Sequence, residues 1–89
     1  MQLSDFPELN DGFVGFYRRV FSDGALDKKT KEMLAVAFSY GNGCASCVRT
    51  HEAKARRLGM TDAEYRELVA VCEVIAAGGV RELFVENAG

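Results

Sequence analysis

The spacing of the apolar residues restricts the possible folds of this chain more than any other feature of its sequence. Apolar residues recur at helical spacing, and no stretch alternates between apolar and polar residues. The clearest example follows the single proline, Pro7, where apolar residues recur three, four, seven and eight positions apart: Phe13, Phe16, Tyr17, Val20 and Phe21. This period is typical of an amphipathic helix, and Ser22-Asp23-Gly24 should end it. The sequence therefore predicts an all-α fold, with this aromatic stripe in the core or at a subunit interface.

Capping and breaking signals divide the rest of the chain into further helices. One helix should run from Asp27 to about Tyr40, and the next from Cys44 to Leu58. A further helix should start at the capping box Thr61-Asp62-Ala63-Glu64 and reach about Ala77. A short last helix should follow around Val80, Leu83 and Phe84. Glycines should supply the breaks between them, at Gly41-Asn42-Gly43, Gly59 and Gly78-Gly79. The prediction is a bundle of about five helices.

The length of 89 residues indicates a single domain, spanning residues 1–89. A chain this short buries only about 60–65% of its unfolded surface, so its own core is marginal. The helix that should end near Ala77 is apolar on two opposite sides, with Leu68 and Val71 on one and Ala70 and Val74 on the other. Because such a helix must be covered on both sides, we expect a homo-oligomer.

Charge and cysteine usage exclude several classes of partner and suggest a compartment. The formal net charge of −2 argues against nucleic acid as a partner. No apolar run approaches the roughly 20 residues of a membrane span, and the first residues do not resemble a secretory signal, so we expect no membrane partner. Three cysteines in such a chain point to a reducing compartment, here the cytoplasm.

Cys44, Cys47 and His51 form the most informative chemical pattern. At about 100° per residue they share one narrow stripe of a helix, on its inward side beside Val48 and Leu58. Two thiols three positions apart can close a small disulfide ring. Cys44 would sit at the helix N-terminus, where a thiolate is favoured, and His51 lies one turn after Cys47, within reach of its proton. The pattern favours a redox-active dithiol.

Other interpretations of these residues remain open at this point. Cys72 could complete a zinc site of three cysteines and one histidine, although it lies in an apolar stripe where a free cysteine behaves as a small hydrophobe. His51 could be an ordinary core histidine. Haem attachment is excluded because Val48, not histidine, follows the second cysteine. Glu32 lies at the border of its helix's apolar face and could turn toward the dithiol or pair with Lys28 on the surface.

The combined spacing of Glu32, eleven residues, Cys44-x-x-Cys47, three residues and His51 resembles the AhpD-like (alkylhydroperoxidase) branch of the carboxymuconolactone decarboxylase family. The similarity extends over about two-thirds of the chain, from Asp27 onward, and the joint spacing of four chemically apt residues is far more specific than the cysteine pair alone. It implies an all-α fold in symmetric oligomers, often trimers or hexamers. It also implies a dithiol that cycles to a disulfide, without cofactor or metal.

The resemblance also implies roles for the site residues. Glu32 and His51 would form a proton relay, Cys47 would attack a hydroperoxide, and Cys44 would resolve the oxidised sulfur and meet a dithiol reductant such as a dihydrolipoyl group. Two departures stand out: Ser46 occupies the place where some members carry a second histidine, and the chain is about half the length of two-repeat members. The decarboxylase of the family's name is a poor match, because decarboxylation needs no dithiol.

The sequence therefore predicts a cytoplasmic thiol-dependent peroxidase that uses Glu32, Cys44, Cys47 and His51. Within enzymes, the alternative is a disulfide reductase that serves a separate peroxiredoxin. From another class, the alternative is a zinc-stabilised or purely structural oligomeric module without turnover.

Overall fold

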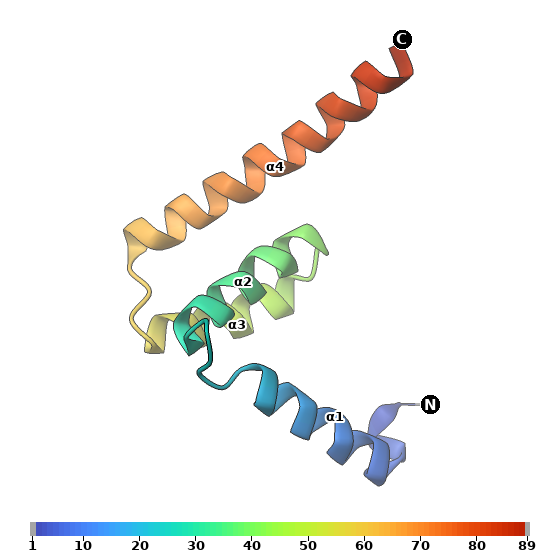
Figure 1. Ribbon diagram of the computed structural model, residues 1–89, viewed down its shortest axis with the longest axis vertical. Helices are drawn as coiled ribbons and strands as arrows, with labels where there is room; N and C mark the ends of the chain where they lie inside the picture. Colours follow the sequence, from blue (N-terminus) through green and yellow to red (C-terminus); the bar gives the residue numbers. More distant parts are fainter. Residues whose placement is uncertain (1, 89) are drawn as a thin grey trace.

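The computed structural model describes residues 2–88, and among these residues every regular element is helical. A short 3-10 helix, η1 (Leu3–Asp5), precedes four α-helices: α1 (Pro7–Val20), α2 (Lys28–Gly41), α3 (Ala45–Arg57) and α4 (Asp62–Ala88). Figure 1 shows α2 and α3 lying side by side, with α1 and α4 extending from this pair in different directions. The predicted all-α class is confirmed.

The α2–α3 hairpin begins and turns where the sequence places its signals. The Asp27 side chain accepts a hydrogen bond from the Thr30 amide at 2.7 Å, which caps α2. That amide is the main reason why the pKa of the Asp27 carboxyl lies below its usual value. At the other end of α2, Gly43 has φ 69°, a left-handed conformation suited to glycine, and the Cys44 amide donates to the Ser39 carbonyl at 3.0 Å. The chain thereby reverses and places Cys44 at the N-cap of α3.

The connection between α3 and α4 also follows the sequence signals. Gly59 has φ 103°, and Met60, which follows it, is buried. The predicted capping box forms in both directions: the Glu64 amide donates to Thr61 Oγ1 at 3.1 Å, and the Thr61 amide donates to Glu64 Oε1 at 2.9 Å. Lys29 Nζ on α2 binds Glu64 Oε2 at 2.8 Å, which holds the start of α4 beside α2.

The predicted break at Gly78-Gly79 is wrong, because α4 runs without interruption from Asp62 to Ala88. The chain therefore has four α-helices in the described region rather than about five. A glycine inside a helix costs only about 1 kcal/mol relative to alanine and keeps its backbone N–H donor, unlike proline. Good helix formers lie on both sides, namely Ala76 and Ala77 before the glycines and Arg81, Glu82 and Leu83 after them, and the helix continues.

The enclosed core is small, and most large apolar side chains are exposed. Within residues 2–88 the buried apolar side chains are Val36, Ala55 and Met60, all in or beside the α2–α3 hairpin. By contrast, the outer parts of α1 and α4 carry a series of exposed apolar side chains: Leu9, Phe13, Phe16, Val20, Val71, Val74, Ile75, Val80, Leu83, Phe84 and Val85. Within residues 2–88 no helix combines the length and apolarity that crossing a membrane requires.

Candidate active site

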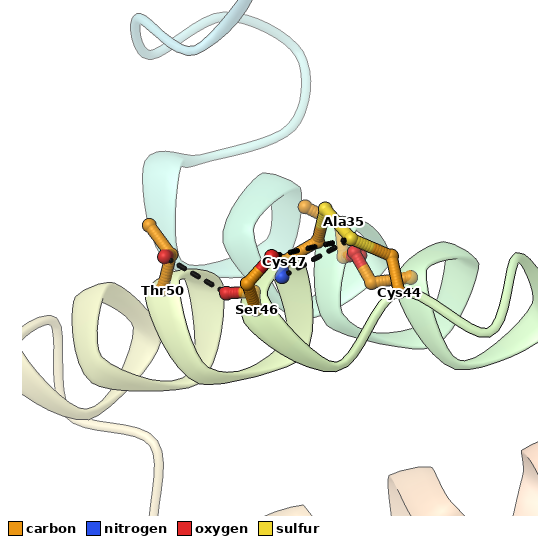
Figure 2. The surroundings of a disulfide bond; sticks show 6 residues. Ala35, Cys44, Ser46, Cys47 and Thr50 are labelled. Atoms are coloured by element: carbon orange, nitrogen blue, oxygen red, sulfur yellow. Dashed lines mark hydrogen bonds between the residues drawn. A yellow bond between two sulfur atoms is a disulfide. The ribbon is translucent and has the colours of Figure 1, made fainter.

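Cys44 and Cys47 are joined by a disulfide at the start of α3, with their Cα atoms 5.3 Å apart. The Cys47 amide donates to Cys44 Sγ at 3.3 Å, and Ser46 Oγ lies 3.6 Å from the same sulfur (Figure 2). Both cysteines are partly exposed. After reduction, negative charge on Cys44 would be favoured, because its sulfur lies at the N-terminus of α3 and the Cys47 amide points at it.

Glu32 and His51 form a second pair, which joins α2 to α3. His51 Nδ1 lies 2.6 Å from Glu32 Oε2, and the side chains of Glu32 and His51 are only 8% and 15% exposed. Because a carboxylate oxygen accepts, Nδ1 is the ring nitrogen that carries the hydrogen in this bond. A buried carboxylate needs such a partner. The arrangement leaves Nε2 as the nitrogen available for proton transfer.

The hairpin determines how these four residues are arranged. Glu32 turns inward from α2 to His51 and forms no surface pair with Lys28. On α3 the two cysteines and His51 lie on successive turns, so the disulfide and the Glu32–His51 pair share one side of the helix. Within residues 2–88 no hydrogen bond joins His51 to either sulfur while the sulfurs are bonded to each other. The geometry thus brings together two adjacent pairs.

Two aromatic side chains contact His51, and sequence reasoning did not connect them with the site. Phe21 follows α1 and stacks on the imidazole with ring centroids 5.6 Å apart. Tyr17, in the last turn of α1, stacks on Phe21 at 4.6 Å and lies 6.4 Å from the imidazole. The sequence indicated an apolar stripe that includes both rings, but a pattern within one helix cannot reveal which ring meets a residue thirty positions away.

An open cavity of about 470 Å³ lies on another side of α3, between its first turns and the start of α4. Cys44 contributes to its wall, together with Arg49 and two tyrosines, Tyr40 and Tyr65. The two phenols are hydrogen-bonded to each other. That bond is the main cause of a raised pKa at Tyr65, and burial and the nearby Glu52 add to it. The phenol of Tyr65 is therefore neutral at physiological pH, and the cavity offers a partly apolar approach to Cys44.

The residues suggested for zinc do not gather. Cys72 lies on α4, where its thiol faces the Ala37 carbonyl of α2 at 3.8 Å. In the part of the chain that the structure describes, no three histidine, cysteine, aspartate or glutamate side chains lie close enough to hold a metal ion. Cys72 is partly buried between two helices, which suits the interpretation as a small hydrophobe.

Comparisons with known sequences identify the protein family to which this chain is related. Residues 7–85 match the carboxymuconolactone decarboxylase family. An uncharacterized protein of the cox locus of Paracoccus denitrificans is 39% identical over 70 residues, which cover 79% of this chain and 63% of that protein. An alkyl hydroperoxide reductase AhpD of Streptomyces griseus is 35% identical over 78 residues, covering 88% of this chain and 44% of that protein. The chain thus spans less than two-thirds of each of these two relatives.

Solved structures agree with the sequence comparisons. The alkylhydroperoxidase AhpD core of Rhodospirillum rubrum superimposes with a TM-score of 0.88 at 32% identity, over 94% of this chain and 62% of that one. A protein from Methanobacterium thermoautotrophicum, which matches over 94% of both chains, gives a TM-score of 0.86 at 32% identity. With the family match over most of its length, the chain belongs to the carboxymuconolactone decarboxylase family, in its AhpD-like branch.

Proposed function

We propose that this protein is a cytoplasmic thiol-dependent peroxidase, in which Cys47 reacts with a hydroperoxide and Cys44 completes the disulfide. The observation that carries the proposal is the 2.6 Å bond between Glu32 and His51, one turn along α3 from the cysteine pair. Removing a carboxylate and an imidazole from water costs desolvation free energy, so a nearly buried pair of this kind suggests a role in the chemistry. Beside a dithiol, the role that suits it is to accept and return protons. The AhpD-named relatives support the same reaction class.

The proposed oxidation has two steps. His51 accepts the thiol proton of Cys47, and Glu32 stabilises the resulting imidazolium. The Cys47 thiolate attacks the outer peroxide oxygen, so an S–O bond forms, the O–O bond breaks, and the alkoxide leaves as an alcohol with the proton from His51. The Cys44 thiol then gives its proton to His51 and attacks the sulfenic sulfur of Cys47. The S–S bond forms, the S–O bond breaks, and the hydroxide leaves as water with that proton. Two electrons pass from the dithiol to the hydroperoxide, and the disulfide of the structure is the product.

Reduction of the disulfide returns the two electrons. A dithiol reductant, such as a dihydrolipoyl group, attacks Cys44, releases the Cys47 thiolate and then closes its own disulfide. The cavity of about 470 Å³ beside Cys44 supports attack at that sulfur. The same cavity also favours a second candidate function, reduction of a disulfide on a separate peroxiredoxin, because it gives Cys44 an open side.

We further propose that the active form is a homo-oligomer, a trimer or a hexamer. The support is the series of exposed apolar side chains along α1 and α4, of which Phe16 is 67% and Phe84 is 72% exposed. Apolar surface of this extent usually marks an interface. The chain's own helices leave it uncovered, so copies of the same chain would supply the missing layer.

A thiol count tests the proposed reaction directly. The fully reduced chain has three thiols, and one equivalent of hydroperoxide should reduce the count to one, because Cys44 and Cys47 pair while Cys72 stays free. Intact-mass measurement should detect the loss of two hydrogens and no added oxygen. A Cys72→Ser variant is the matched control, and its count should fall from two to zero.

The same measurement separates the alternatives. If hydroperoxide leaves all three thiols intact while a peroxiredoxin disulfide oxidises the pair, the protein is a disulfide reductase. If neither oxidant changes the count and the protein carries stoichiometric zinc, it is a structural module and the proposed function is wrong.

A further inference from the structure

The end of α1 contacts the rest of the chain through the candidate active site. α1 does not pack backbone to backbone against α2, α3 or α4 within residues 2–88. Instead, the side chains of Tyr17 and Phe21 reach across to His51. Lys54 of α3 donates to Tyr17 Oη at 3.3 Å, and its ammonium lies 5.2 Å from the centre of the Tyr17 ring. Lys31 of α2 donates to the Ser22 carbonyl at 2.7 Å and fixes the chain just after Phe21.

The stacking has a defined geometry. The Phe21 ring lies nearly parallel to the imidazole of His51, at 13° and 5.6 Å, and Tyr17 stacks on Phe21 at 27°. Tyr17 of α1, Phe21 just after α1 and His51 of α3 therefore form a stack of three rings. The side chain of His51 is only 15% exposed, and aromatic pairs contribute about 0.5–1.5 kcal/mol beyond the apolar area that they bury.

The stack supplies a restraint that the bond to Glu32 does not. A hydrogen bond at Nδ1 fixes one edge of the imidazole, but the ring can still pivot about that edge, because the terminal torsion of histidine is broad. A flat neighbour against the ring face restricts the pivot. With both restraints present, Nε2 is held in a single direction, which proton transfer over hydrogen-bond distance requires.

We propose that Phe21, supported by Tyr17, is a positioning residue that orients His51 for proton transfer. This inference rests on the proposed function, because it assigns His51 as the base. Phe21 touches no reacting atom and acts through the imidazole. Its flat face should matter more than its apolar volume, so leucine should fail to replace it and tyrosine should succeed.

The test uses full-length variants and two independent readouts. The first is the single-turnover rate at which hydroperoxide oxidises the reduced dithiol, measured across pH by quenched thiol labelling. Phe21→Leu should slow the reaction roughly tenfold and change the shape of the pH–rate profile, since misplacement of a catalytic group by about 1 Å can cost up to 100-fold. Phe21→Tyr should stay within about twofold of the natural protein.

The second readout is the NMR signal of the imidazole, which is unambiguous because His51 is the chain's one histidine. In the oxidised protein, the ring protons of His51 should be displaced upfield by the stacked rings. Phe21→Leu should remove that displacement and Phe21→Tyr should keep it. This readout needs no turnover, so it tests the positioning even if the proposed peroxidase reaction fails.

Phe6→Leu is the matched control: it makes the same change just before α1, at a side chain that is 42% exposed and outside the apolar series proposed for the interface. It should leave both readouts unchanged. If Phe21→Leu does not fold, Tyr17→Leu with Tyr17→Phe as its conservative partner replaces the pair, with the same expected contrast. The inference is overturned if leucine and the conservative variant behave alike, or if Phe6→Leu reproduces the loss. An unchanged NMR signal in Phe21→Leu would also overturn it.

Discussion

Replacing Cys47 with serine is expected to abolish hydroperoxide consumption. A serine hydroxyl ionises far above neutral pH and cannot form a sulfenic acid, so the first bond to oxygen never forms. We assign Cys47 as the attacking sulfur because it lies one turn from His51, whose Nδ1 is held by Glu32 at 2.6 Å. The expected rate is that of the uncatalysed reaction. Hydroperoxide loss, followed with excess dithiol reductant, measures it.

Two further serine variants serve as controls for this result. Cys72→Ser should retain full turnover, because Cys72 faces a backbone carbonyl between α2 and α4. Without added reductant, Cys44→Ser should consume one equivalent of hydroperoxide and then stop, with one oxygen added to Cys47. The resolving thiol is gone, and the thiol of Cys72 faces the Ala37 carbonyl between α2 and α4. This partial reaction distinguishes a resolving cysteine from an attacking one.

A reversed outcome would have a specific structural meaning. In the disulfide form, Cys44 Sγ accepts a hydrogen bond from the Cys47 amide at 3.3 Å, and Cys44 is the N-cap residue of α3. These features also favour a thiolate on Cys44. If Cys47→Ser reacts once and Cys44→Ser does not react at all, helix-terminal stabilisation decides which sulfur attacks, and the proposed assignment of the two cysteines is wrong.

Local signals predicted the α2–α3 hairpin well, because each signal acts within a few residues. Asp27 caps α2 through Thr30, three positions later, and Gly43 adopts the left-handed conformation for which the break was predicted. The same local reasoning failed at Gly78-Gly79. There the cost of two glycines competes with a whole helix of favourable residues, and the helix continues.

The candidate site was only partly predictable for a related reason. Cys44, Cys47 and His51 share a helix, so their common side follows from their spacing. Glu32 stood at the border of an apolar face, and only the packing of α2 on α3 decides that it turns inward to His51. Phe21 meets His51 from a third segment, across thirty positions of sequence. No period within one helix contains that information, so the aromatic stack needed the structure.

Replacing Glu32 with glutamine is expected to slow the first oxidation step about 100-fold, within the range typical for loss of general acid–base catalysis. The amide oxygen of glutamine can still accept the hydrogen of His51 Nδ1, so the ring keeps its place while the negative charge is lost. Without that charge, the side chain at position 32 no longer stabilises the imidazolium that forms when His51 takes the Cys47 proton. Single-turnover oxidation of the reduced protein by hydroperoxide measures the effect.

Glu64→Gln provides the matched control for this charge effect. Glu64 also pairs with a basic group, Lys29, at 2.8 Å, but its side chain is 37% exposed and it joins α4 to α2 away from the sulfurs. Loss of this exposed charge should change stability only slightly and leave the oxidation rate unchanged. Equal rates in Glu32→Gln and the natural protein would remove Glu32 from the relay. A slow rate in both variants would instead assign the effect to loosened packing of the helices, because the two variants share only the loss of a charge pair between helices.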